Sequence, residues 1–193
     1  MTARKLNRPK NTAYHEAGHA VIARVLTLAS GQATIKSNYR DRTAGHSITA
    51  DPDTCVYQWE KRGKVRGFFP DDAAFHARLI TYMAGAETEA VLLGIDAIGD
   101  GDDRYQIALM AHSLMGVSNS DEFWDRIEPR LRAMTRMLIR RHRDRIERTA
   151  KALLKKTTLS GPQLDKLIGR SVNDVKVNQP LLKMMHQQQT AVV

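Results

Sequence analysis

The sequence lacks the features that identify secreted or membrane-spanning proteins. It contains one cysteine, Cys55, so it cannot form an intrachain disulfide, which excludes a disulfide-stapled secreted scaffold. Its best apolar run, Ala20 to Ser30, is interrupted by Arg24 and is shorter than the ~18 residues that a membrane span needs. The basic N-terminus lacks the apolar core and cleavage site of a signal peptide. We therefore expect a soluble, cytoplasmic protein without a membrane partner.

Internal repeats and a P-loop pattern are also missing, so this chain is not expected to hydrolyse nucleotides. With 193 residues, of which 42% are apolar, the chain can bury one hydrophobic core. We predict a basic arm at 1–10, one folded domain at 11–169, and a polar, loosely ordered tail at 170–193.

The positive charge is concentrated in one segment. Residues 130–156 contain eleven Lys and Arg but only two acids, Asp144 and Glu147, whereas the rest of the chain has nineteen of each sign. Apolar residues at helical spacing predict one amphipathic helix over this segment, with a cationic outer face. That face is either simply solvated or a contact for an acidic protein or nucleic acid. No aromatic residue interleaves with the charges, which argues against a platform for stacking single strands.

Hydrophobic periodicity predicts a mainly α, α+β fold with a small β element. The predicted helices, each bounded by capping or stop residues, cover 11–28, 71–94, 102–116, 130–156 and 162–168. Two short strands are predicted at 33–37 and 45–50, and the segment 55–70 is expected to be irregular.

The first predicted helix carries an HExxH motif, His15 to His19. Residues four apart lie on one face of a helix, so both imidazoles can bind one metal ion. Glu16 then lies beside the metal without being a ligand, where it can take a proton from a metal-activated water. The alternative is a pair of hydrogen-bonded core histidines, but such an apolar helix would not normally bury these polar groups without partners.

A catalytic zinc site needs a third protein ligand. None of the other histidines forms a close second motif with the first pair: His46, His76, His112, His142 and His186. Asp103 is a better candidate, because the residues that follow it at helical spacing are apolar and must face the core. Asp102 leads a more polar face and is expected to cap the helix. For Asp103, capping and compensation of the helix dipole remain the alternative.

Four segments resemble the FtsH-type zinc peptidase domain, in the order of that family: 13–20, 83–90, 99–108 and 152–161. The resemblance covers residues 11–169 and implies a mostly helical, zincin-like peptidase domain with a small β element beside the active site. It also implies one zinc ion held by His15, His19 and Asp103, with Glu16 as the general base for hydrolysis of peptide bonds.

By the same resemblance, a strand comprising Gly45, His46, Ser47 and Ile48 would pair with an extended polypeptide substrate. FtsH family members also carry a membrane anchor and an ATPase module, and this sequence shows neither pattern. We therefore expect ATP-independent endopeptidase activity on flexible or unfolded polypeptide, with a homo-oligomer or a separate ATPase as possible assemblies.

Two other functions compete with this one. The chain could be a protein- or nucleic-acid-binding module that uses the basic helix 130–156, with a structural or vestigial zinc site. It could also be a zinc protease of a different clan, with the same chemistry on another fold. Glu16 distinguishes the binding module from the enzymes, because a structural zinc site does not need that acid.

Overall fold

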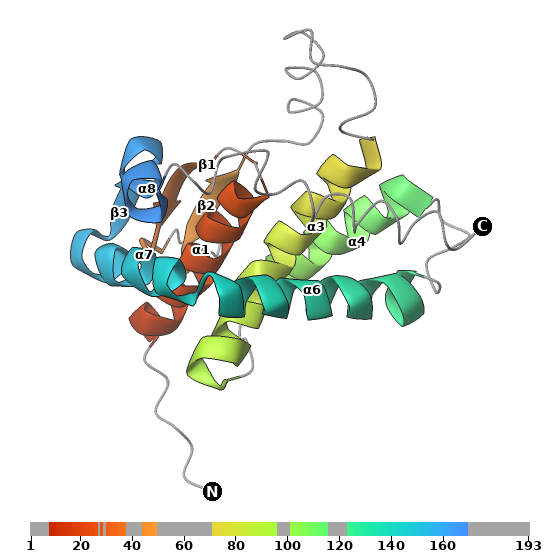
Figure 1. The fold of residues 1–193 in the computed structure, drawn as a ribbon, viewed down its shortest axis with the longest axis horizontal. Coiled ribbons are helices and arrows are strands. Elements are labelled where there is room, and N and C mark those ends of the chain that lie inside the picture. Colours follow the sequence, from red (N-terminus) through yellow and green to blue (C-terminus); the bar gives the residue numbers. More distant parts are fainter. Residues whose placement is uncertain are drawn as a thin grey trace, which may run out of the picture.

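The computed structural model describes residues 8–26, 28, 30–37, 44–49, 71–95, 101–115 and 123–169. Cys55, the predicted irregular segment 55–70 and the predicted tail 170–193 lie outside the described residues. The described part is mainly helical with one small sheet, so the predicted fold class is confirmed (Figure 1). None of its helices combines the length and the apolarity that crossing a bilayer requires.

Helix α1, Arg8–Val25, is the central element of the fold, in contact with α3 (Asp71–Thr88), α7 (Arg143–Lys156) and the sheet. Its residues are therefore buried on nearly every side. The helix begins three residues inside the predicted arm and ends before Leu28. Thr12 lies inside the helix, where its hydroxyl donates to the carbonyl oxygen of Arg8 at 3.0 Å.

Helices α1 and α3 pack closely against each other at Gly18, which has no side chain. A Cβ on Gly18 would lie 2.4 Å from the Thr88 hydroxyl oxygen and 2.6 Å from the carbonyl oxygen of Ala84. No larger residue fits without moving one helix away from the other. The close crossing holds the two motif histidines of α1 directly against α3.

The sheet is antiparallel in the order β2-β1-β3. Its strands are β1 (Ser30–Thr34), β2 (His46–Thr49) and β3 (Thr158–Ser160). Both predicted strands form, with β1 shifted toward the N-terminus. β3 was not predicted, because its three residues carry no alternating pattern and form a strand only by pairing with β1, more than a hundred residues earlier. The short helix α8, Gly161–Ile168, follows directly.

The prediction of one continuous basic helix is wrong, because the segment forms two helices. These are α6 (Glu128–Arg141) and α7, which meet at His142, where φ is −108° and ψ is 20°. They follow one another across one side of the molecule (Figure 1). Because α6 packs against α3 and α7 against α1, the non-helical residue lets each helix turn its own apolar face to its own neighbour.

Candidate metal centre and active-site cleft

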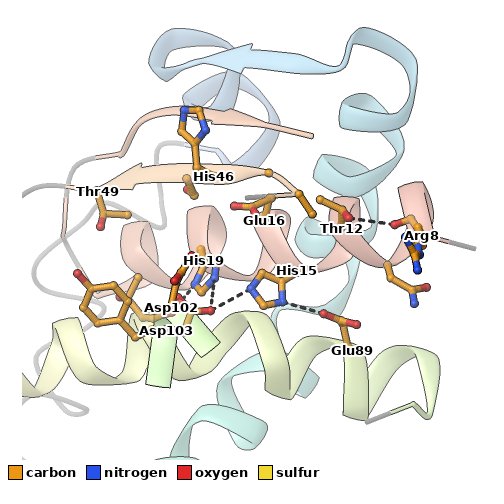
Figure 2. A pocket seen from close by; sticks show the side chains of 16 residues that line it. Arg8, Thr12, His15, Glu16, His19, His46, Thr49, Glu89, Asp102 and Asp103 are labelled. Carbon is orange, nitrogen blue, oxygen red and sulfur yellow. Dashed lines mark hydrogen bonds and ion pairs between the residues drawn. The ribbon is translucent and has the colours of Figure 1, made fainter. Parts of the chain in front are cut away.

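Three predicted ligands come together where α1 meets α4, Gly101–Met115. The Asp103 Oδ2 atom lies 3.0 Å from His15 Nε2 and 3.2 Å from His19 Nε2. Figure 2 shows the two imidazoles and this carboxylate pointing toward one another. One ligand atom from each residue lies within 4.8 Å of the other two. Two imidazoles and one carboxylate, with a side open to a cleft, are a donor set of the kind that catalytic zinc sites use.

The second nitrogen of each imidazole is held by α3 or by the segment that follows it. The Nδ1 atom of His19 lies 2.7 Å from the carbonyl oxygen of Thr81. Because a carbonyl only accepts, Nδ1 carries a proton, which leaves Nε2 as the nitrogen of His19 that could bind a metal ion. The Nδ1 atom of His15 lies 2.7 Å from Glu89 Oε1. Partners of this kind orient metal-binding histidines, and losing one typically lowers metal affinity by about 10–100-fold.

The sequence analysis did not identify Glu89 as part of the site. Glu87 and Glu89 are both buried acids at the end of α3 and just after it, and nothing in the sequence distinguishes them. Two residues apart, they face opposite sides: Glu87 accepts from Arg132 of α6 at 2.9 Å, and Glu89 contacts His15 of α1. Glu89 also begins a π-helical turn, Glu89–Leu93, a feature often found at functional sites.

Charge coupling within the cluster is strong. Burial alone would lower the pKa of His15, but its hydrogen bonds to Asp103 and Glu89 outweigh that effect and raise the pKa to about 10. Burial alone would raise the pKa of Asp103, yet the two imidazoles hold it well below its usual range. The ionised carboxylate and the imidazoles therefore attract one another, and a bound cation would take the place of the imidazole protons.

Glu16 lies beside the cluster with an unused carboxylate oxygen. The side chain is 5% exposed, and its Oε2 atom has no hydrogen-bond partner among the described residues. Burial raises the pKa of this carboxyl, and His19 and His15 offset part of the shift. In Figure 2 the Glu16 side chain lies between α1 and β2. A buried carboxylate oxygen without a partner is costly, so it is typical of a position that serves a reaction rather than the fold.

A cleft of about 450 Å³ opens above these groups. The predicted substrate strand forms part of its wall, because Gly45, His46 and Ser47 line it, whereas Ile48 is 52% exposed and is not among the lining residues. Thr49, the last residue of β2, also lines the cleft. The geometry thus gives an extended chain a strand to lie beside, and pairing with that strand stays a prediction.

Asp102 lies at the rim of the cleft and is exposed. The prediction that it caps the helix is wrong, because α4 already begins at Gly101 and Asp102 is the second residue of its first turn. A carboxylate there still interacts favourably with the helix dipole.

Some cations of the basic segment 130–156 form contacts within the fold and are not available to a partner. Arg132 pairs with Glu87 and Glu128, while Arg145 donates to the carbonyl oxygen of Ile168. Several other cations of α6 and α7 are exposed: Arg130, Arg140, Arg141, Arg148, Lys151, Lys155 and Lys156. An acidic protein or nucleic acid as the partner of this face stays a prediction.

Gly85 of α3 lies directly beneath the two imidazoles. A Cβ there would be 2.4 Å from His15 Nε2 and 2.5 Å from His19 Nε2. These atoms are the far ends of side chains, so the rings can rotate away without disturbing the helices. A methyl group at this position would therefore occupy the ligand side of the site.

We expect Gly85→Ala to fold normally and to lose zinc affinity by at least about tenfold, because the displaced rings can no longer converge. Alanine is favoured over glycine inside a helix by ~0.5–1 kcal/mol, so the helix itself is not weakened. Calorimetric zinc titration and thermal unfolding measure the two effects separately. Gly101→Ala is the matched control, since a Cβ there meets nothing within 4 Å. Equal zinc affinity in both variants would contradict the geometry.

Comparison with known proteins gives a partial answer about the class of protein. No family model matches the chain. The chain is similar to a curated protein, the ATP-dependent zinc metalloprotease FtsH 1 of Symbiobacterium thermophilum, with 27% identity over an alignment of 178 residues. The match covers 81% of this chain and 28% of that protein, so the chain spans less than a third of its relative's length. The similarity suggests an FtsH-related peptidase region, in agreement with the resemblance of the motifs.

Proposed function

We propose that this chain is a zinc-dependent metallopeptidase that hydrolyses flexible or unfolded polypeptide without ATP. The observation that carries the proposal is the convergence of His15, His19 and Asp103 beside the buried Glu16, whose Oε2 atom has no hydrogen-bond partner among the described residues. A structural metal site needs ligands such as these three, but it does not need Glu16 beside them. The similarity to a zinc metalloprotease supports the same class of activity.

The residues fit a zinc ion held by the Nε2 atoms of His15 and His19 and by the carboxylate of Asp103. Zinc bound there would supply Lewis acidity, lowering the pKa of a water molecule and polarising the substrate carbonyl. Thr81 and Glu89 fix the tautomer and the orientation of the rings through their Nδ1 atoms, so the ligands are arranged before any ion binds.

Glu16 would act as the general base. Its unpaired Oε2 can accept a proton from the attacking water, and burial makes this carboxylate a stronger proton acceptor than an exposed one. After the amide bond breaks, the same carboxyl can pass that proton to the departing amine. Because it is not one of the three ligands, it is free to move the proton during both steps.

The cleft supports a polypeptide as the substrate. β2 is an outer strand of the described sheet and lines the cleft beside Glu16, so an extended backbone can add to it as a further strand. Such binding requires a locally unfolded chain, which is why we propose flexible substrates. A separate ATPase or self-assembly would extend the range to folded proteins.

Zinc content and casein cleavage test the function together. We expect about one zinc ion per purified chain, cleavage of casein, loss of cleavage after treatment with a chelator, and recovery when zinc is added back. The measurements are elemental analysis and gel electrophoresis of the products. A chain that holds zinc yet cleaves neither casein nor a broad panel of unstructured peptides would contradict the peptidase and favour a binding module.

A further inference from the structure

Tyr82 is a cleft residue that the chemistry above does not use. It lies on α3, lines the cleft and is half-buried. Its neighbours in sequence are both fixed: the carbonyl of Thr81 accepts from His19, and Met83 is buried in the core. The backbone that carries this phenol is therefore tied directly to a candidate metal ligand.

Arg78, one turn earlier, holds the Tyr82 side chain. Its Nη2 atom donates to the tyrosine hydroxyl oxygen at 3.0 Å, and the guanidinium lies 4.6 Å from the ring centroid. Arginine has no acceptor, so the phenol oxygen accepts this bond and its own proton remains available to donate. A neighbouring cation also makes the hydroxyl a stronger donor.

The pair has hydrogen-bonding capacity that the described fold does not use. The Nη1 atom of Arg78 is buried without a partner among the described residues. The nearby cleft groups Asp103, Glu16 and Glu89 are acceptors when ionised. A polypeptide carbonyl is also an acceptor, and those carboxylates cannot bind it. The hydroxyl of Tyr82 supplies a neutral donor in the wall formed by α3.

We propose that Tyr82 contacts the substrate, donating its hydroxyl proton in a hydrogen bond to a carbonyl oxygen of the bound polypeptide, and that Arg78 positions it. This inference rests on the proposed function and adds a substrate-binding residue to the same cleft. With β2 on one wall and Tyr82 on another, the backbone of the substrate is held from two sides.

Tyr82→Phe tests the contact, since it removes only the hydroxyl and keeps the ring. We expect kcat/KM for a fluorogenic peptide to fall about tenfold, the usual effect of one lost hydrogen bond, with zinc content and melting temperature unchanged. Tyr105→Phe is the matched control: Tyr105 is 63% exposed, is not among the cleft-lining residues, and should leave kcat/KM unaltered. Arg78→Met should lower kcat/KM in the wild type but have little further effect in the Tyr82→Phe background.

Binding of an uncleaved peptide separates the two proposals. In the zinc-loaded Glu16→Gln chain, adding Tyr82→Phe should raise the dissociation constant of the same peptide about tenfold. Fluorescence anisotropy measures this constant. If the wild type cleaves peptides and Tyr82→Phe matches it in both kcat/KM and affinity, the Tyr82 contact is overturned and the peptidase stands. If the zinc-loaded wild type neither cleaves nor binds polypeptide, both are overturned.

Discussion

Replacing Glu16 with glutamine is expected to abolish hydrolysis of unfolded protein while leaving zinc bound. Glutamine has nearly the same size, so it fills the same buried space, but its amide cannot accept a proton from the attacking water. General acid–base catalysis contributes about 10²–10⁴-fold to rate, and the loss should be of that order. Initial rates of casein cleavage and zinc content, measured on the same preparation, check both halves of the expectation.

The control for this variant is Glu147→Gln on α7. Glu147 forms an i, i+4 pair with Arg143 at 2.8 Å on the surface of that helix. Such surface pairs contribute little to stability, so the control should cleave casein at the wild-type rate. Should Glu16→Gln cleave as fast as the wild type, the base must be another group, and the unpaired Glu16 oxygen would need a different explanation.

Asp103→Asn is expected to weaken zinc binding by more than about a hundredfold, whereas Asp102→Asn should bind zinc like the wild type. Losing a residue that merely supports a ligand costs about 10–100-fold in affinity, and loss of the charged ligand itself should exceed that range. Asp103 contacts both imidazoles, whereas Asp102 is an exposed residue of the rim one position earlier on the same helix. Competition with a chromogenic zinc chelator measures both affinities.

The pair of adjacent variants makes this experiment selective. Both remove one negative charge from the first turn of α4, so a general electrostatic effect would weaken zinc binding in both. A loss confined to Asp103→Asn, and greater than the ~10–100-fold effect of an orienting partner, would favour direct coordination. Equal losses in both variants, or a loss confined to Asp102→Asn, would show that the third ligand has been assigned incorrectly.

Much of the fold could be predicted from the sequence because apolar residues recur within the helices and capping or stop residues bound several of them. The mainly α class, the helix around His15 and the two strands near the cleft all follow from local patterns. The errors concern elements whose form depends on distant partners. β3 exists because β1 is beside it, and the basic segment divides at His142 because its halves pack against different helices.

The candidate site likewise has features that local sequence predicts and features that depend on distant partners. The amino-acid sequence by itself determined that His15 and His19 share a helix face with Glu16 beside them, because this follows from 3.6 residues per turn. It also favoured Asp103 over Asp102 as the acid that faces inward, since apolar residues follow Asp103 at helical spacing.

Only the tertiary structure decided what surrounds these groups. It selected Glu89 over Glu87 as the partner of His15, placed the carbonyl of Thr81 against His19, and put Gly85 beneath both rings. The physical reason is that α3 meets α1 through residues about seventy positions apart in the chain. Which side of α3 faces α1 depends on how the side chains of the two helices pack together, and that packing is a property of the pair rather than of either segment alone.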